Sequence, residues 1–173
     1  RPVAGFLHII DYVGLVIINI EVLEIIIDGL IGTHRFFSFL GTIYNFLIGS
    51  FEILAFLVLV AVIIFFIRRN IIKLKRFVHS DLKGWPKSDG NIILYFEVVL
   101  MSLFLLMNAA DFHLQNVVGG FMEYHPAGSF PISQYISTFF DGVPNATVYV
   151  IERAAWWFHI TGILIFLNYL YFT

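Results

Sequence analysis

Four long apolar stretches dominate this chain, and their length restricts the folds that it can adopt. A helix needs about 20 apolar residues to cross the hydrocarbon core of a membrane, and each stretch reaches or exceeds that length. The period-two alternation that marks the strands of a membrane β-barrel is absent. The sequence therefore predicts an all-α integral membrane bundle of four transmembrane helices. The predicted spans are Val3–Asp28, Phe36–Ile67, Asn91–Ala110 and Val148–Phe172.

The composition agrees with a membrane environment. Of the 173 residues, 60% are hydrophobic and 13% are charged, against about 25% charged in soluble domains, and the mean hydropathy is +0.89. The net charge of −2 argues against nucleic acid as a partner. These residues include no cysteine, so they hold no disulfide, zinc-thiolate site or iron-sulfur cluster. Because the sequence starts at Arg1 and stops within an aromatic run, we interpret residues 1–173 as one transmembrane domain from a longer chain.

The positive charges predict the orientation of the bundle. Seven of the ten Lys and Arg residues lie between the second and third spans, in a basic loop over residues 68–90. Cytoplasmic loops of membrane proteins carry such an excess, so we expect this loop to be cytoplasmic. The turn Gly32–Arg35 and the segment from Asp111 to Thr147 then lie outside.

A short helix is predicted within this outer segment. Pro131 is a favourable first helical residue, and the apolar side chains that follow it recur at helical spacing. The apolar positions are Ile132, Tyr135, Ile136 and Phe139. We expect this helix to lie along the outer surface.

Acidic residues inside the predicted spans are costly in a membrane and need partners. The first span carries Asp11, Glu21, Glu24 and Asp28, and the other spans offer Glu52, Glu97, Glu152 and Arg153. Because Arg153 is the only cation expected near the outer half of the bundle, it should pair with a nearby carboxylate. The candidates are Glu24, Asp28 and Glu152. Two roles for the carboxylates stay open, a proton or quinone pathway and hydrogen bonds that join helices.

Two histidines inside the predicted spans are candidate haem ligands, because a neutral imidazole binds haem iron well. In the fourth span His159 lies on one helical stripe with Ala155 and Gly162, which leave room one turn to either side. In the first span His8 lies one turn before Asp11, whose carboxylate could accept the imidazole N–H. The competing interpretation is that each histidine only forms a hydrogen bond to a neighbouring helix.

The remaining histidines lie outside the apolar spans and lack the spacing of metal ligands. We expect them to be solvated or interfacial. They are His34, His79, His113 and His125.

Several strings of the sequence together resemble a known membrane domain. They are Arg1–Gly14, Asp28–Arg35, Arg68–Asn70, Lys83–Pro86 and Glu152–His159. The domain that they resemble belongs to bacterial iron-sulfur-binding oxidoreductases of the heterodisulfide-reductase-like type. It is in turn similar to the cytochrome b (gamma) subunit of respiratory nitrate reductase. The resemblance covers nearly the whole chain.

The resemblance implies a haem-b and quinone domain in the bacterial inner (plasma) membrane. Such a domain binds b-type haem and passes electrons between membrane quinone or quinol and a cytoplasmic iron-sulfur domain or subunit. The expected partners are therefore the lipid bilayer, a quinone and that iron-sulfur domain. The chain would be the membrane component of an oxidoreductase.

The resemblance also implies ligand positions. In the nitrate reductase relative, an early helix and the last helix each supply two histidines to two haems, and His8 and His159 match the first histidine of each. The second histidine of the early helix is missing, since Ile18 and Asn19 occupy its surroundings. The number of haems therefore stays open.

Depth separates the two candidate ligands. In the predicted topology His8 lies near the cytoplasmic surface and His159 near the middle of the membrane, so we expect them to bind different haems. A partner for His8 would come from residues beyond Thr173. A partner for His159 would come from His34, His113 or a non-histidine ligand.

Two other functions remain open from the residues alone. One is a proton-conducting or transport module in which the carboxylates of the first span form the path. No proline breaks a span and no internal repeat is evident, and both observations argue against such a module. The other is a haem-free membrane anchor whose histidines only pack.

Overall fold

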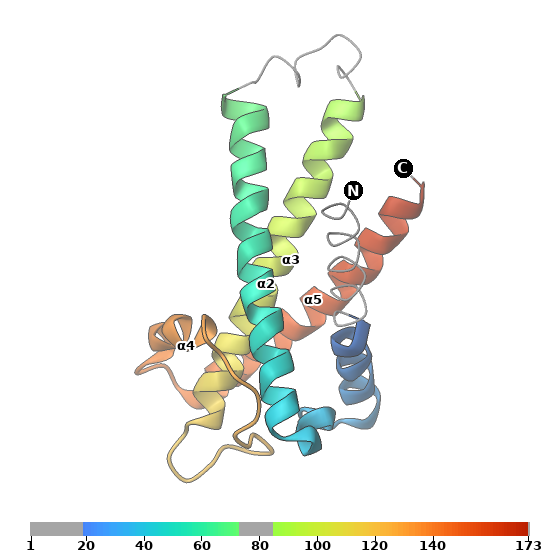
Figure 1. Ribbon diagram of the computed structural model, residues 1–173. Helices are drawn as coiled ribbons and strands as arrows, with labels where there is room; N and C mark the ends of the chain where they lie inside the picture. The colour runs from blue at the N-terminus through green and yellow to red at the C-terminus, as the bar shows by residue number, and fades with distance from the viewer. Residues whose placement is uncertain (1–18, 73–84, 173) are drawn as a thin grey trace, which may run out of the picture.

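The computed structural model describes residues 19–72 and 85–172. This part of the chain is helical, and in place of a sheet it has one isolated bridge between Phe121 and Tyr124. A helix covers residues 19–31. The elements that follow are the 3-10 helix η1 (Phe36–Leu40), α2 (Thr42–Phe66), the π-helical turn η2 (Ile67–Ile71), α3 (Trp85–Gln115), α4 (Ser133–Ile136), the 3-10 helix η5 (Ser137–Phe140) and α5 (Asn145–Phe172) (Figure 1).

Within the described residues, three helices are long and apolar enough to span a membrane. These spans are Thr42–Ile71, Ser88–Gln115 and Asn145–Phe172, with mean hydropathies of 2.9, 2.1 and 1.4. The predicted all-α membrane architecture is thus confirmed. Most of the first predicted span, Val3–Asp28, precedes residue 19 and lies outside the described residues. The fourth transmembrane helix therefore stays a prediction.

The second span begins later than the apolar pattern predicts. Residues Phe36–Leu40 form a separate 3-10 helix, whose phenylalanine rings pack edge to face. Gly41 follows with a φ of 58°, in the left-handed region that favours glycine, and α2 starts only at Thr42. The apolar run from Phe36 therefore contains two helices. The backbone conformation of Gly41 separates them, although the residues on both sides of it are hydrophobic.

Helix α3 is the centre of the described bundle, because both α2 and α5 pack against it (Figure 1). Two glycines allow close helix contacts. At Gly162 of α5 an added Cβ would come within 2.7 Å of the Leu100 side chain on α3. At Gly29 it would come within 2.5 Å of the Trp156 ring on α5. Small residues at such contacts are typical of membrane bundles, where close backbone approach improves van der Waals packing.

The two ends of the bundle differ. One end, which we call the turn end, carries residues 32–41 and the segment over 116–144 (Figure 1). Near the opposite end Asn70 and Asn91 exchange two amide hydrogen bonds, of 3.0 and 3.2 Å, between η2 and α3. The short helix predicted after Pro131 is confirmed as α4 and η5. Its position relative to the membrane surface stays a prediction.

The Gly29 contact yields a test of the packing of the 19–31 helix. A methyl group at residue 29 would collide with a rigid indole, so Gly29→Ala should push this helix away from α5. Overpacking of this kind costs about 1–3 kcal/mol, and we expect a lower thermal-unfolding midpoint for the full-length protein in detergent. In a Trp156→Phe background the same substitution should cost less. Equal costs in both backgrounds would contradict the contact.

Candidate functional site

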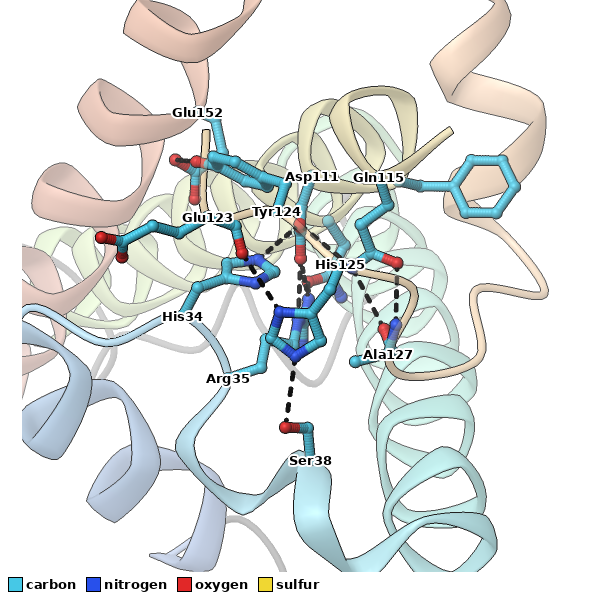
Figure 2. A network of polar contacts seen from close by, with 12 residues as sticks. His34, Arg35, Ser38, Asp111, Gln115, Glu123, Tyr124, His125, Ala127 and Glu152 are labelled. Atoms are coloured by element: carbon cyan, nitrogen blue, oxygen red, sulfur yellow. Dashed lines mark hydrogen bonds and ion pairs between the residues drawn. The ribbon is translucent and has the colours of Figure 1, made fainter. Parts of the chain in front are cut away.

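A buried ion pair joins the 32–35 turn to α3 at the turn end (Figure 2). The Asp111 carboxylate accepts two hydrogen bonds from the Arg35 guanidinium, at 2.5 and 2.7 Å. Its other oxygen lies 2.8 Å from Nε2 of His34 and also accepts a hydrogen bond of 3.1 Å from Gln115. The side chains of His34 and Arg35 are each 10% exposed and that of Asp111 is 4% exposed. Charges removed from water to this extent are stable only when they are paired.

Arg35 has partners beyond Asp111. It donates to the Asn108 side-chain oxygen at 3.1 Å, and its guanidinium lies 5.0 Å from the centre of the Phe130 ring. Burial alone would lower the pKa of Arg35, but the Asp111 carboxylate overrides this and holds it well above its ordinary value. Arg35 is therefore a permanent cation. The expectation that Arg153 is the only cation in this half of the bundle is wrong, because the turn folds Arg35 back inside.

His34 presents a ring nitrogen that no protein group uses. The Asp111 carboxylate accepts from Arg35 and has no proton to give, so Nε2 of His34 carries the shared proton. In the neutral ring Nδ1 then holds a lone pair, and it is the one buried side-chain nitrogen or oxygen without a partner among the described residues. The expectation that His34 is solvated or interfacial is wrong, because its pairing with Asp111 buries it. A ligand could use the free nitrogen.

Two cavities open beside His34. One has a volume of about 330 Å³ and is lined in part by Tyr124, Tyr149 and Arg153. The other, of about 410 Å³, lies towards His125. Figure 2 shows the His34 ring near the rings of Tyr124 and His125. Its centre is 4.4 Å from that of Tyr124 and 5.3 Å from that of His125. Small-molecule sites commonly measure about 300–1,000 Å³, so either cavity could hold a ligand headgroup.

Carboxylates of the 19–31 helix hold the turn in place. Asp28 accepts hydrogen bonds of 3.0 Å from the backbone N–H groups of Arg35 and Phe36. Glu24, one turn earlier, accepts a 2.8 Å bond from the N–H of Phe37. Arg35 has a φ of 56°, which is uncommon outside glycine, and these bonds stabilise that conformation. The position of the His34 ring thus depends on two carboxylates that the sequence placed in the first predicted span.

The predicted pairing of Arg153 is confirmed for Glu152. Arg153 donates two hydrogen bonds to this neighbouring carboxylate, which also accepts a 2.8 Å bond from the Tyr124 hydroxyl. Burial, and after it the negative charge of Glu152, raise the pKa of Tyr124 above its ordinary value. The phenol therefore remains a hydrogen-bond donor, and it ties the 116–130 segment to α5.

His159 lies in the interface between α5 and α3. The residue is 5% exposed, its Nδ1 lies 3.0 Å from the carbonyl oxygen of Leu100, and its ring centre is 5.6 Å from that of Phe104. A carbonyl only accepts, so Nδ1 carries the proton and Nε2 keeps the lone pair. Metal-binding histidines typically use this arrangement, in which one nitrogen donates to an acceptor and the other binds the metal. The tautomer of this ring therefore suits a metal ligand.

The surroundings of His159 differ from the expectation. Leu100 fills the space beside Gly162 that we expected a porphyrin to use, so this glycine serves the packing of α5 on α3. His34 and His159 contact α3 at Asp111 and Leu100, which lie eleven residues apart, or about 16 Å along a helix. The structure does not bring His34 next to His159.

The other candidate histidines are accounted for as follows. His8 and His79 lie outside the described residues. His113 is partly buried, with its ring centre 6.0 Å from that of Phe140, and His125 is exposed as predicted. Within residues 19–72 and 85–172, no group of three or more His, Cys, Asp or Glu side chains could hold a metal ion.

Comparison with known proteins yields a distant relative. Over 166 residues the chain is 31% identical to the probable iron-sulfur-binding oxidoreductase FadF of Bacillus subtilis (strain 168). The chain is related to an iron-sulfur-binding oxidoreductase. The match covers 96% of this chain and 21% of the relative, so the chain spans about one fifth of the relative's length. No protein-family model and no solved structure matches the chain.

The ion pair can be tested by removing one charge. Asp111→Asn leaves Arg35 buried without a counter-charge, and breaking a buried pair from one side costs about 3–5 kcal/mol. We expect a large fall in the thermal-unfolding midpoint and in the yield of folded protein. Asp141→Asn, at an exposed carboxylate of the same end, is the matched control and should leave both unchanged. Equal stability of the two variants would show that the pair does not hold the turn end together.

Proposed function

We propose that residues 1–173 form a single membrane electron-transfer domain of an iron-sulfur oxidoreductase. The domain binds b-type haem and exchanges electrons with membrane quinone or quinol. An iron-sulfur domain or subunit outside these residues is its cytoplasmic redox partner. The observation that carries the proposal is the hydrogen bond from Nδ1 of His159 to the Leu100 carbonyl, which leaves the lone pair of the neutral ring on Nε2. The relation to an iron-sulfur-binding oxidoreductase supports the choice of reaction class.

His159 is the proposed axial ligand of a haem in the bundle. When bound, haem b supplies reversible one-electron transfer. The Leu100 carbonyl fixes the imidazole tautomer, and Phe104 and the rest of α3 keep water from that side of the ring. Such hydrogen bonding and burial tune the potential of a bound haem. For His8 the resemblance alone supports a second haem site.

The quinone headgroup is proposed to bind beside His34 in the cavity of about 330 Å³. Oxidation of a quinol to a quinone releases two electrons and two protons. The free Nδ1 of His34 can accept one of these protons from a quinol hydroxyl, while Asp111 and Arg35 hold the ring in place. The other proton can leave to water, because the cavity is open to solvent. In the reverse direction the same nitrogen returns the proton.

The orientation follows the charge distribution. The basic loop over residues 68–90 is proposed to be cytoplasmic, which puts the turn end outside a bacterial inner (plasma) membrane. Proton release at His34 would then occur on the outer side. The loop can also dock an acidic surface of the iron-sulfur partner.

Three of the described carboxylates support this function over a proton-conducting module. Glu24 and Asp28 bind backbone N–H groups of the turn, and Glu152 binds Arg153 and Tyr124. Groups engaged in this way hold segments of the chain together. A proton path through them would require these bonds to break at each transfer.

An absorption spectrum of the full-length protein tests the haem assignment. The reduced-minus-oxidised spectrum should show the bands of a b-type haem, and His159→Ala should remove or shift one set of them because the iron loses a ligand. His125→Ala, at an exposed histidine of the turn end, is the matched control and should leave the bands intact. Absence of the bands from the unmodified protein, or bands that persist unchanged in His159→Ala, would overturn the assignment.

The role of His34 can be separated from haem binding. His34→Gln keeps an N–H that can donate to Asp111 but loses the basic nitrogen. General-base groups of this kind contribute about 10²–10⁴-fold, so quinol-dependent reduction should slow by at least about 10²-fold while the haem bands persist. His125→Gln, at the neighbouring exposed histidine, should keep the full rate. An unchanged rate in His34→Gln, or the same loss in both variants, would contradict the role.

A further inference from the structure

The chain over residues 128–133 follows α2 from near its start towards its middle. The Gly128 N–H donates to the Asn45 side-chain oxygen at 2.9 Å. A few residues later, the N–H groups of Ile132 and Ser133 donate to the Glu52 carboxylate at 2.8 and 3.1 Å. Glu52 is completely buried and lies seven residues beyond Asn45 along α2. This stretch therefore runs along the helix from the turn end towards the bundle centre.

The chain then turns and comes back along α3. The Ser133 hydroxyl donates to the Leu105 carbonyl oxygen at 3.0 Å. At the end of η5, Phe140 packs with Ala109 and Leu114, which lie closer to the turn end of α3. Residues 128–140 thus form a hairpin-like excursion between α2 and α3, with its deepest point near Ser133. Figure 1 shows α4 beside the body of these two helices, short of their ends at the turn end.

The depth of this excursion follows from helix geometry. Glu52 lies ten residues from the start of its span at Thr42, and Leu105 lies ten residues from the end of its span at Gln115, or about 15 Å in each case. Spans of 28 to 30 residues are about 42–45 Å long and exceed a hydrocarbon core of about 30 Å by about 6–8 Å at each end. Ser133 therefore lies about 7–9 Å inside the hydrocarbon core.

Two aromatic side chains of α4 and η5 project outward. Tyr135 and Phe139 are 72% and 82% exposed, whereas Ser133, Ser137 and Phe140 point inward and are at most 7% exposed. Large exposed aromatic rings favour contact with lipid over contact with water.

Several polar side chains of the segment form hydrogen bonds within the protein, as a hydrocarbon environment favours. The hydroxyls of Ser137 and Thr138 donate to carbonyls of the preceding turn, at 2.7 and 2.8 Å. The amide nitrogen of Gln134 donates back to the Pro131 carbonyl at 3.2 Å. Non-helical backbone at membrane depth is tolerated only when it is protected in this way.

We propose that residues 128–140 form a re-entrant loop that enters the bilayer from the turn end, and that Tyr135 and Phe139 contact lipid acyl chains. Glu52 caps the deepest backbone N–H groups of this loop. The placement replaces the expectation of a helix along the outer surface. It rests on depth and exposure, and it holds whether or not the domain binds haem or quinone.

Cysteine accessibility tests the proposal. Single cysteines replace Phe139, Ile53 and Val118 in the full-length protein, and open membrane sheets are treated with a membrane-impermeant maleimide, with the parent protein as background. Ile53 lies on α2 beside Glu52 and is 47% exposed, while Val118 lies in the turn-end loop and is fully exposed. Maleimides react with the thiolate, which needs water, so Phe139→Cys and Ile53→Cys should react at least about tenfold more slowly than Val118→Cys.

The labelling rates at Phe139 and Tyr135 decide whether the segment lies in lipid or in water. Phe139 is exposed, so its replacement opens no cavity, and Tyr135→Cys gives a second position on the same face. All the cysteines should react alike after denaturation in detergent. If Phe139→Cys and Tyr135→Cys react in membranes as fast as Val118→Cys, the segment lies in water and the re-entrant placement is overturned.

Discussion

The buried pair of Arg35 and Asp111 is the interaction on which the turn end depends. It connects residues 76 positions apart in the sequence, and it fixes the turn that presents His34. A guanidinium at this depth has a high desolvation cost, which only a charged partner and further hydrogen bonds offset. The cation and the carboxylate therefore specify one arrangement of the turn against α3. The left-handed backbone at Arg35 is a consequence of that arrangement.

The same network continues along α3 and reaches Glu52 on α2. Arg35 donates to Asn108, Asn108 donates to Glu52 at 3.3 Å, and Glu52 accepts from the backbone at Ser133. A continuous set of hydrogen bonds thus links the turn that holds His34 to the segment between α2 and α3. Each member is buried where water cannot replace a lost partner, so the two loops are expected to be stable together. In a membrane the hydrophobic effect does not drive helices together. Polar contacts such as these therefore help to hold the helices and loops of the bundle together.

The sequence predicts the spans well because the physics that sets them is local. Apolar length decides whether a helix can cross a membrane, and each described span falls close to its predicted stretch. The break at Gly41 escaped prediction because the apolar run continues across it. The burial of His34 was not predicted for a different reason. It depends on Asp111, which is 77 residues away in the sequence. The adjacent Arg35 could have indicated this burial. Arg35 is a cation next to an apolar run, and such a cation needs either water or a carboxylate as its partner. The pairing of Arg153 with Glu152 could be predicted because the two residues are neighbours in the sequence.

The carboxylates and the imidazoles of this structure have different roles. The carboxylates of Glu24, Asp28, Asp111 and Glu152 are occupied by backbone groups or cations, so they fix positions. The two buried imidazoles each use one nitrogen on α3, His34 at the Asp111 side chain and His159 at the Leu100 carbonyl. In each ring the other nitrogen keeps its lone pair in the neutral form, which suits it to bind a proton or a metal ion. Because both rings are anchored to one helix, α3 fixes their separation along the bundle. The proposed proton transfer at His34 and the proposed electron transfer at His159 would then take place at sites that a single rigid helix keeps apart.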